Sequence, residues 1–181
     1  RPWTVKKETD RLVCTTRTTD EPIVDFTRTL AFAENRLTWQ FNVQNLGRVA
    51  LPFLHVMHAL LPLDHVRDLR LPDFAAVVEE VGDEALPLAN AAEVARYLLA
   101  LPAGHAVMLL LRGVATGRYQ VVFADGWRLT ATFDAELFPT LGIWWNPRGY
   151  PDDAGGRRSE CALEPIPGRW SSLARSHREG G

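Results

Sequence analysis

Hydrophobic and polar residues alternate along much of the chain, the pattern of β-strands that bury one face and expose the other. Over residues 37–44, Leu, Trp, Phe and Val take one side while Thr, Gln, Asn and Gln take the other. Similar alternation, or a short apolar run, marks further segments: 12–19, 26–32, 66–72, 105–114, 119–123, 127–133, 141–146 and 160–164. The pattern predicts about nine or ten strands.

Turn residues separate these segments. Asp125-Gly126 stands between two alternating runs, which is the strongest short signal of a β-hairpin. Residues 45–47 read as a turn, and 147–158 form a loop rich in Pro, Gly and Asp. The apolar run 49–63 contains two prolines, which limit strand pairing there.

The middle of the chain has a different composition. Helix-forming residues occur at 73–81 and 91–101, and Leu101-Pro-Ala-Gly ends the second stretch. We expect residues 73–104 to interrupt the series of strands with one or two short helices. Many strands with little helix predict an all-β, antiparallel β-sandwich. A length of 181 residues favours a single domain over 1–181.

Composition excludes several classes of function. The hydrophobic fraction of 46% and charged fraction of 23% are those of a soluble globular protein. A net charge of −2 provides no broad basic surface, so no nucleic-acid or anionic-membrane partner is expected. No uninterrupted apolar run reaches the ~18 residues of a membrane span. Cys14 and Cys161 are far apart with no metal-binding spacing, and the chain starts without an apolar leader. Two free thiols and a cytoplasmic location are the expectation.

Residues 141–151 and 162–168 carry the strongest functional signal. Trp144, Trp145 and Asn146 lie at the end of one predicted strand, and Glu164 lies on the next. An aromatic ring stacks on the C–H face of a sugar while polar groups meet its hydroxyls, so these residues favour a carbohydrate ligand. One of the adjacent tryptophans must face the core. Asn146 and Arg148 are candidate hydroxyl-binding residues, although turn formation explains Asn146-Pro147 equally well.

Two histidines lie in the apolar run at 49–63. With a carboxylate, a histidine forms the minimal pair for proton transfer, so His58 is a catalytic candidate. A hydrogen-bonded core histidine is the alternative. His55 is a candidate binding residue, although on an extended strand it and His58 would point to opposite faces. A His55–His58 metal pair lacks a third ligand with suitable spacing, so no metal site is predicted.

Three motifs, taken in order, resemble the galactose mutarotase-like (aldose 1-epimerase) superfamily: Pro52-Phe-Leu-His-Val-Met-His58-Ala-Leu, Gly142-Ile-Trp-Trp-Asn and Ala162-Leu-Glu-Pro-Ile-Pro-Gly. The resemblance extends over residues 25–175. It implies a large antiparallel supersandwich, of which this chain would be a reduced member lacking N-terminal strands and the last strand. An incomplete sandwich exposes sheet edges, so a homodimer formed through an edge is the corresponding hypothesis.

The resemblance also implies a mechanism. Glu164 matches the family's base, which takes the proton of the anomeric hydroxyl, and His58 matches the acid, which protonates the ring oxygen. An upstream His and Arg of the family would fall before residue 1, and Ala59-Leu60-Leu61 replaces the Tyr and Asn-Leu that follow the acid histidine. This chemistry uses no cofactor. A non-catalytic carbohydrate-binding module and an interaction domain without a ligand are the alternatives.

Overall fold

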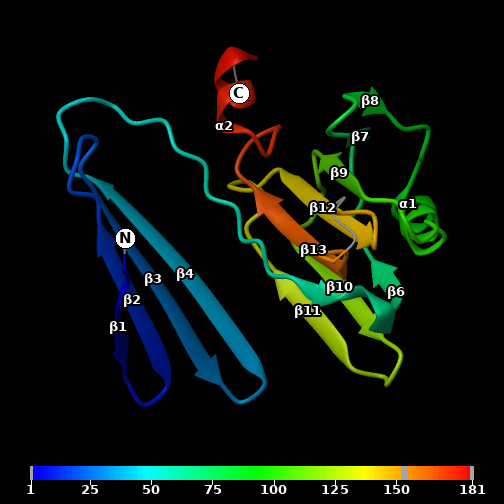
Figure 1. The fold of residues 1–181 in the computed structure, drawn as a ribbon, viewed down its shortest axis with the longest axis horizontal. Helices are drawn as coiled ribbons and strands as arrows, with labels where there is room; N and C mark the ends of the chain where they lie inside the picture. Colours follow the sequence, from blue (N-terminus) through cyan, green and yellow to red (C-terminus); the bar gives the residue numbers. More distant parts are fainter. Residues whose placement is uncertain (1, 152–154, 180–181) are drawn as a thin grey trace. The chain divides into compact units, whose positions relative to one another are not determined.

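The computed structural model describes residues 2–151 and 155–179. The chain divides into two compact units, Arg1–Phe53 and Leu54–Gly181 (Figure 1). Strand pairing within the sheets is antiparallel throughout. The expectation of a single domain over 1–181 stays a prediction.

The first unit is a four-stranded sheet in the order β1-β2-β3-β4. Its strands are β1 (Thr4–Lys7), β2 (Arg11–Arg17), β3 (Val24–Ala33) and β4 (Arg36–Asn45). The register pairs Phe26 with Val43 and Leu30 with Trp39, so apolar side chains share one face, while Thr27 and Thr29 pair with Asn42 and Gln40 on the other. The predicted alternation at 37–44 is therefore a strand with one apolar and one polar face.

The second unit contains two antiparallel sheets that form a β-sandwich (Figure 1). A six-stranded sheet has the order β5-β13-β12-β9-β7-β8, and a three-stranded sheet has the order β11-β10-β6. The elements of this unit, in chain order, are β5 (Leu61–Pro62), the 3₁₀ turn η1 (Leu63–His65), β6 (Val66–Arg70), β7 (Ala76–Glu79), β8 (Glu84–Ala85), α1 (Ala91–Leu99), β9 (Val107–Arg112), β10 (Arg118–Phe123), β11 (Arg128–Thr132), β12 (Thr140–Pro147), β13 (Ser159–Ile166) and α2 (Leu173–Arg178).

The main core fills the space between the two sheets. Inward-pointing residues of both sheets make up this core together with helix α1: Leu69, Tyr119, Val121, Leu109, Leu111, Leu141, Ile143, Trp145, Cys161, Leu163, Val94 and Leu98. Helix α1 begins at Asn90, whose side chain accepts a hydrogen bond from the backbone N–H of Glu93. Burial raises the pKa of the Cys161 thiol to about 12, so this free cysteine is a packing residue and not a reactive one.

Tyr119 links the two sheets through a buried hydrogen bond. Its hydroxyl donates to the backbone oxygen of Leu163 at 3.1 Å, and burial raises its pKa to about 12. We expect Tyr119→Phe to lower the free energy of unfolding by about 1 kcal/mol, because the carbonyl of Leu163 loses its partner in the core. Urea unfolding measures this change. Tyr150→Phe is the matched control, since Tyr150 is exposed and we expect no loss there. Equal effects of the two substitutions would contradict the role of this bond.

The all-β sandwich prediction is confirmed, and so are several local predictions. Residues Asp125-Gly126 form the hairpin between β10 and β11, with Gly126 at φ +90°. The helix expected at 91–101 is α1. The helix considered at 73–81 is wrong, because Val77 and Val78 are buried in β7, which pairs with β9. Sheet pairing overrides local helix propensity there. In the described part of the chain, no helix has the length and hydrophobicity needed to cross a bilayer.

Candidate functional site

The candidate site lies on the outer face of the six-stranded sheet, the face turned away from the main core. Ile143 and Trp145 of β12 and Leu163 of β13 point into that core. Because side chains alternate along a strand, Gly142 and Trp144 of β12 and Glu164 of β13 belong to the outer face. The register places Gly142 opposite Glu164 and Trp144 opposite Ala162.

His58 and Glu164 meet on this face although 106 positions separate them in sequence. The Nδ1 atom of His58 is in hydrogen-bond contact with Oε1 of Glu164. Glu164 is only 5% exposed, whereas the His58 side chain is 49% exposed. The imidazole therefore lies between the buried carboxylate and solvent. The expected pair of proton-transfer groups is brought together.

An irregular segment carries His58 across the sheet. Residues 51–60 belong to no helix or strand, as expected from the prolines that flank this run. Leu54 and Val56 of the segment pack on a second apolar cluster formed by Leu110, Ile166 and Trp170. These apolar contacts fix the segment, and they place His58 over Glu164. His55 lies half-buried in the same segment.

Burial determines the electrostatics of Glu164. It raises the pKa of this carboxyl above its ordinary value of 4.5, His58 opposes the rise by its charge and its hydrogen bond, and Glu80 adds a smaller rise. A carboxylate with a raised pKa is a stronger base near neutral pH than a solvated one. This property suits a group that takes a proton from a substrate hydroxyl.

The raised pKa of Glu164 predicts a specific pH dependence of stability. Below pH 4.5 the carboxyl is protonated in both the folded and the unfolded chain. Above that pH the folded chain holds the proton more tightly, so this group lowers stability as pH rises through its folded pKa. We expect Glu164→Gln to gain stability relative to the natural chain between pH 4.5 and neutrality, in urea unfolding at several pH values. A difference between the two proteins that does not change with pH would contradict the shift.

Trp144 is the aromatic residue that shares the face of Glu164. The two are diagonal neighbours across the β12–β13 pair, a relation that places side chains about 7–8 Å apart. The ring of Trp144 is half-buried and makes an edge-to-face contact with Tyr150, at 5.7 Å between centroids. The space above Gly142 is filled by the ends of Ile166 and Met108. The half-buried indole of Trp144 therefore lies on the same face of the sheet as the contact between His58 and Glu164.

Trp145 and Asn146, by contrast, are structural. Trp145 is 2% exposed in the main core, so its ring has no surface for a ligand. Asn146 is fully buried. Its Oδ1 accepts hydrogen bonds from the backbone N–H groups of Gly149 and Tyr150, and its Nδ2 donates to the backbone oxygen of Tyr150. The turn interpretation of Asn146-Pro147 is therefore the one that the structure supports, and both residues lie outside the candidate site.

Arg148 lines a separate open cleft of about 640 Å³. Its φ angle is +63°, and its Nη2 lies 3.4 Å from Oδ2 of Asp64. Asp64 also accepts a hydrogen bond from Ser159, and this bond, then Arg148, holds the pKa of the Asp64 carboxyl below its ordinary value. The cleft is lined by Leu60, Leu61, Pro62, Asp64, Arg148, Arg157, Arg158, Ser159 and Glu160. His58 and Glu164 are not among these lining residues.

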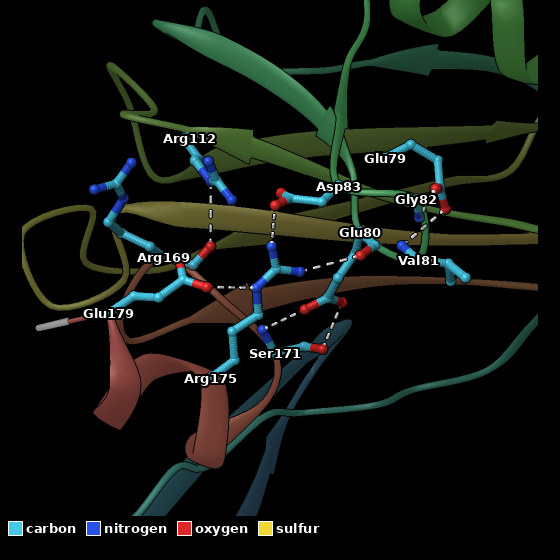
Figure 2. Close-up of polar contacts among 10 residues, drawn as sticks. All are labelled: Glu79, Glu80, Val81, Gly82, Asp83, Arg112, Arg169, Ser171, Arg175 and Glu179. Atoms are coloured by element: carbon cyan, nitrogen blue, oxygen red, sulfur yellow. Dashed lines mark hydrogen bonds and ion pairs between the residues drawn. The ribbon is translucent and has the colours of Figure 1, made fainter.

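Within the second unit, a cluster of polar contacts fixes the C-terminal segment to the turn between β7 and β8 (Figure 2). Glu80 accepts hydrogen bonds from the N–H of Ser171 at 2.9 Å and from its hydroxyl at 2.6 Å. Arg175 pairs with Asp83 at 2.5 Å and with Glu179 at 3.0 Å. It also donates a hydrogen bond to the backbone oxygen of Glu80 at 3.3 Å. This cluster holds Glu80 where its charge contributes to the raised pKa of Glu164.

Trp170 is stacked between two arginines within this cluster. The guanidinium of Arg112 lies 3.9 Å from the ring centroid, and that of Arg175 lies 3.3 Å from it. The Arg175 side chain is only 17% exposed. Cation–π stacking and ion pairing therefore hold Arg175 against the protein. Neither arginine is adjacent to Trp170 in the sequence, so no local pattern signals this arrangement.

Within 2–151 and 155–179, no group of three or more His, Cys, Asp or Glu side chains is arranged to hold a metal ion. The chemistry available to the site is proton transfer by one carboxyl and one imidazole. A scan against protein-family models, a search of the curated proteins and a search of solved structures each returned no match.

Proposed function

We propose that this chain is a carbohydrate-active protein that interconverts sugar anomers, as an aldose 1-epimerase does, with Glu164 and His58 as its proton-transfer pair. The proposal follows from the pairing of a buried carboxyl of raised pKa with a half-exposed imidazole. The order of the three motifs, which resembles the galactose mutarotase-like superfamily, supports the choice of reaction. A hexose or a hexose derivative is the proposed ligand.

The reaction needs one base and one acid. Glu164 takes the proton of the anomeric hydroxyl while the bond between the anomeric carbon and the ring oxygen breaks, and His58 gives a proton to that ring oxygen. Rotation of the open aldehyde and reversal of both transfers closes the ring as the other anomer. Atoms and protons balance with no oxidant, nucleotide or metal. Trp144 supplies the stacking surface from the same face of the sheet.

His58 also controls access to Glu164. The carboxylate is 5% exposed and contacts the imidazole directly, so a sugar reaches it when the imidazole turns aside. Rotation of the half-exposed His58 side chain is enough for this, while Leu54 and Val56 keep the segment in place. In the neutral tautomer that donates from Nδ1 to Glu164, Nε2 faces away and accepts a proton. The same histidine therefore covers the base in the free protein and serves as the acid with sugar bound.

Exchange spectroscopy by NMR tests the proposal. Magnetisation transfer between the α and β anomers of a sugar is recorded with and without the 181-residue chain, across a panel of neutral and acidic hexoses. Faster exchange for at least one sugar, blocked by Glu164→Gln, supports the proposal. No acceleration for any sugar in the panel, with the protein shown to be folded, rejects the catalytic function.

A non-catalytic carbohydrate-binding module is the second candidate function. The observation in its favour is the direct contact between His58 and Glu164, which occupies the carboxylate oxygen that a base needs. This function predicts saturable sugar binding with no change in anomer exchange. Titration calorimetry beside the exchange experiment separates the two, and Trp144→Ala should weaken binding in both cases.

A further inference from the structure

We propose that the chain forms a two-fold symmetric dimer through the outer edge of β4, which pairs antiparallel with β4 of a second copy. Strand β4 ends the sheet of the first unit, in the order β1-β2-β3-β4 (Figure 1). Every second residue of an edge strand points its N–H and C=O outward, away from the neighbour that it already has. Among the described residues, no strand pairs with this side of β4.

The β4 edge differs from every other sheet edge in the described chain. Strands β1, β5, β6, β8 and β11 end the three sheets, and each has five residues or fewer. They carry the features that prevent edge pairing: Lys6 and Lys7 in β1, Pro62 in β5, and Arg67, Asp68 and Arg70 in β6. Short length, proline and charge are the usual protections of an exposed edge.

None of these protections is found in β4. It has ten residues, Arg36–Asn45, with no proline, glycine or lysine, and its only charge is Arg36 at the first position. Its register with β3 runs from the Val24–Asn45 pair to the Ala33–Arg36 pair without a bulge. A long, regular, nearly uncharged edge is a surface for adding a strand.

The residues of β4 complement a second copy of themselves. In antiparallel pairing with Gln40 at the two-fold axis, Trp39 faces Phe41 of the second copy and Leu37 faces Val43 of the second copy. Because opposite residues lie on the same face of a sheet, apolar side chains meet apolar ones, and Thr38 meets Asn42. The two Arg36 residues lie at opposite ends and do not repel each other. Pairing joins two apolar faces, on which Leu37 is 52% exposed and Phe32 is 50% exposed, into one continuous surface.

A matched pair of double variants tests the dimer in the full chain. Gln40→Lys with Asn42→Lys places charge on the polar face of the edge, where the two copies would bring it together. Thr27→Lys with Thr29→Lys is the control, because these residues lie directly opposite Asn42 and Gln40 on the same polar face, but on the central strand β3. Light scattering after gel filtration gives the mass of each protein over a range of concentrations.

We expect the natural chain and the control to have twice the 20.3 kDa chain mass at micromolar concentration. The edge variant should have the single-chain mass, with a dimer dissociation constant raised at least ~10-fold by like-charge repulsion. A natural chain that stays at 20.3 kDa at the highest concentration overturns the proposal. A dimer that the edge variant weakens no more than the control also overturns it.

A mixture of two variants with opposite charges distinguishes charge repulsion from a folding defect in the edge variant. Gln40→Glu with Asn42→Glu is prepared separately and mixed with the lysine variant. If β4 pairs with β4, the two monomeric variants form a mixed dimer, because opposite charges now face each other across the axis. Failure to form a mixed dimer, while circular dichroism shows both variants folded, rejects the β4 interface.

Discussion

Replacing Glu164 with glutamine is expected to lower the protein-dependent rate of anomer exchange by at least ~100-fold, the loss that follows removal of a general base. Glutamine has nearly the shape of glutamate but cannot take a proton at neutral pH. The buried position beside His58 therefore stays filled while the proposed chemistry stops. The measurement is the exchange rate by NMR at a saturating concentration of the sugar that the natural chain accelerates best.

Glu160 provides the matched control for this substitution. It lies on the same strand and the same face as Glu164, four positions earlier, and its carboxylate lies 3.8 Å from Arg158. Glu160→Gln should leave the exchange rate within about two-fold of the natural value, because a carboxylate paired outside the site takes no part in proton transfer. Equal losses in both variants would show that Glu164 acts through the fold or the overall charge and not as a base.

Substitution of the two adjacent tryptophans of β12 is expected to give the second large effect. Trp145→Ala should lower the free energy of unfolding by about 3–5 kcal/mol, because it removes a fully buried indole from the main core. Trp144→Ala, one position away, should lower it by less, since that ring is half-buried on the outer face. Urea unfolding of both variants, compared at equal m-values, gives the two numbers.

For sugar binding, the order of the two effects should be reversed, with the larger loss of affinity in Trp144→Ala. Trp144→Ala removes the proposed stacking surface beside Glu164, whereas a folded Trp145→Ala protein keeps it. A Trp144→Ala variant that binds sugar as tightly as the natural chain would remove this residue from the site. Equal destabilisation by the two substitutions would contradict the assignment of the two faces of β12.

The strands could be predicted from the sequence because their signal is local. Period-two alternation at 37–44 and the Asp125-Gly126 turn are short-range patterns, and both appear in the structure as expected. The helix considered at 73–81 failed for the opposite reason. Val77 and Val78 are fixed in β7 by pairing with Leu111 and Leu110 of β9, more than thirty positions later, and no local pattern reports that contact.

The candidate site, too, could be predicted only in part from the sequence. His58 and Glu164 were selected by residue type and motif, but only the β12–β13 pairing and the path of segment 51–60 bring them together. The environment of Glu164 also depends on Glu80, which Ser171 and Arg175 hold in place from the C-terminal segment. This long-range polar cluster has no periodic signal in the sequence. Asn146 was selected by type as well, but its turn bonds give it a structural role.

The most direct test of the central claim, that His58 and Glu164 form a sugar site, is an NMR titration of the imidazole of His58. The chain has five histidines, so comparison with His58→Gln assigns its ring nitrogen signals. We predict that a sugar with accelerated anomer exchange shifts the Nδ1 and Nε2 signals of His58 saturably, because the imidazole leaves Glu164 and meets the ring oxygen. Signals of His58 that stay unchanged at saturating concentrations of every sugar in the panel would contradict the claim.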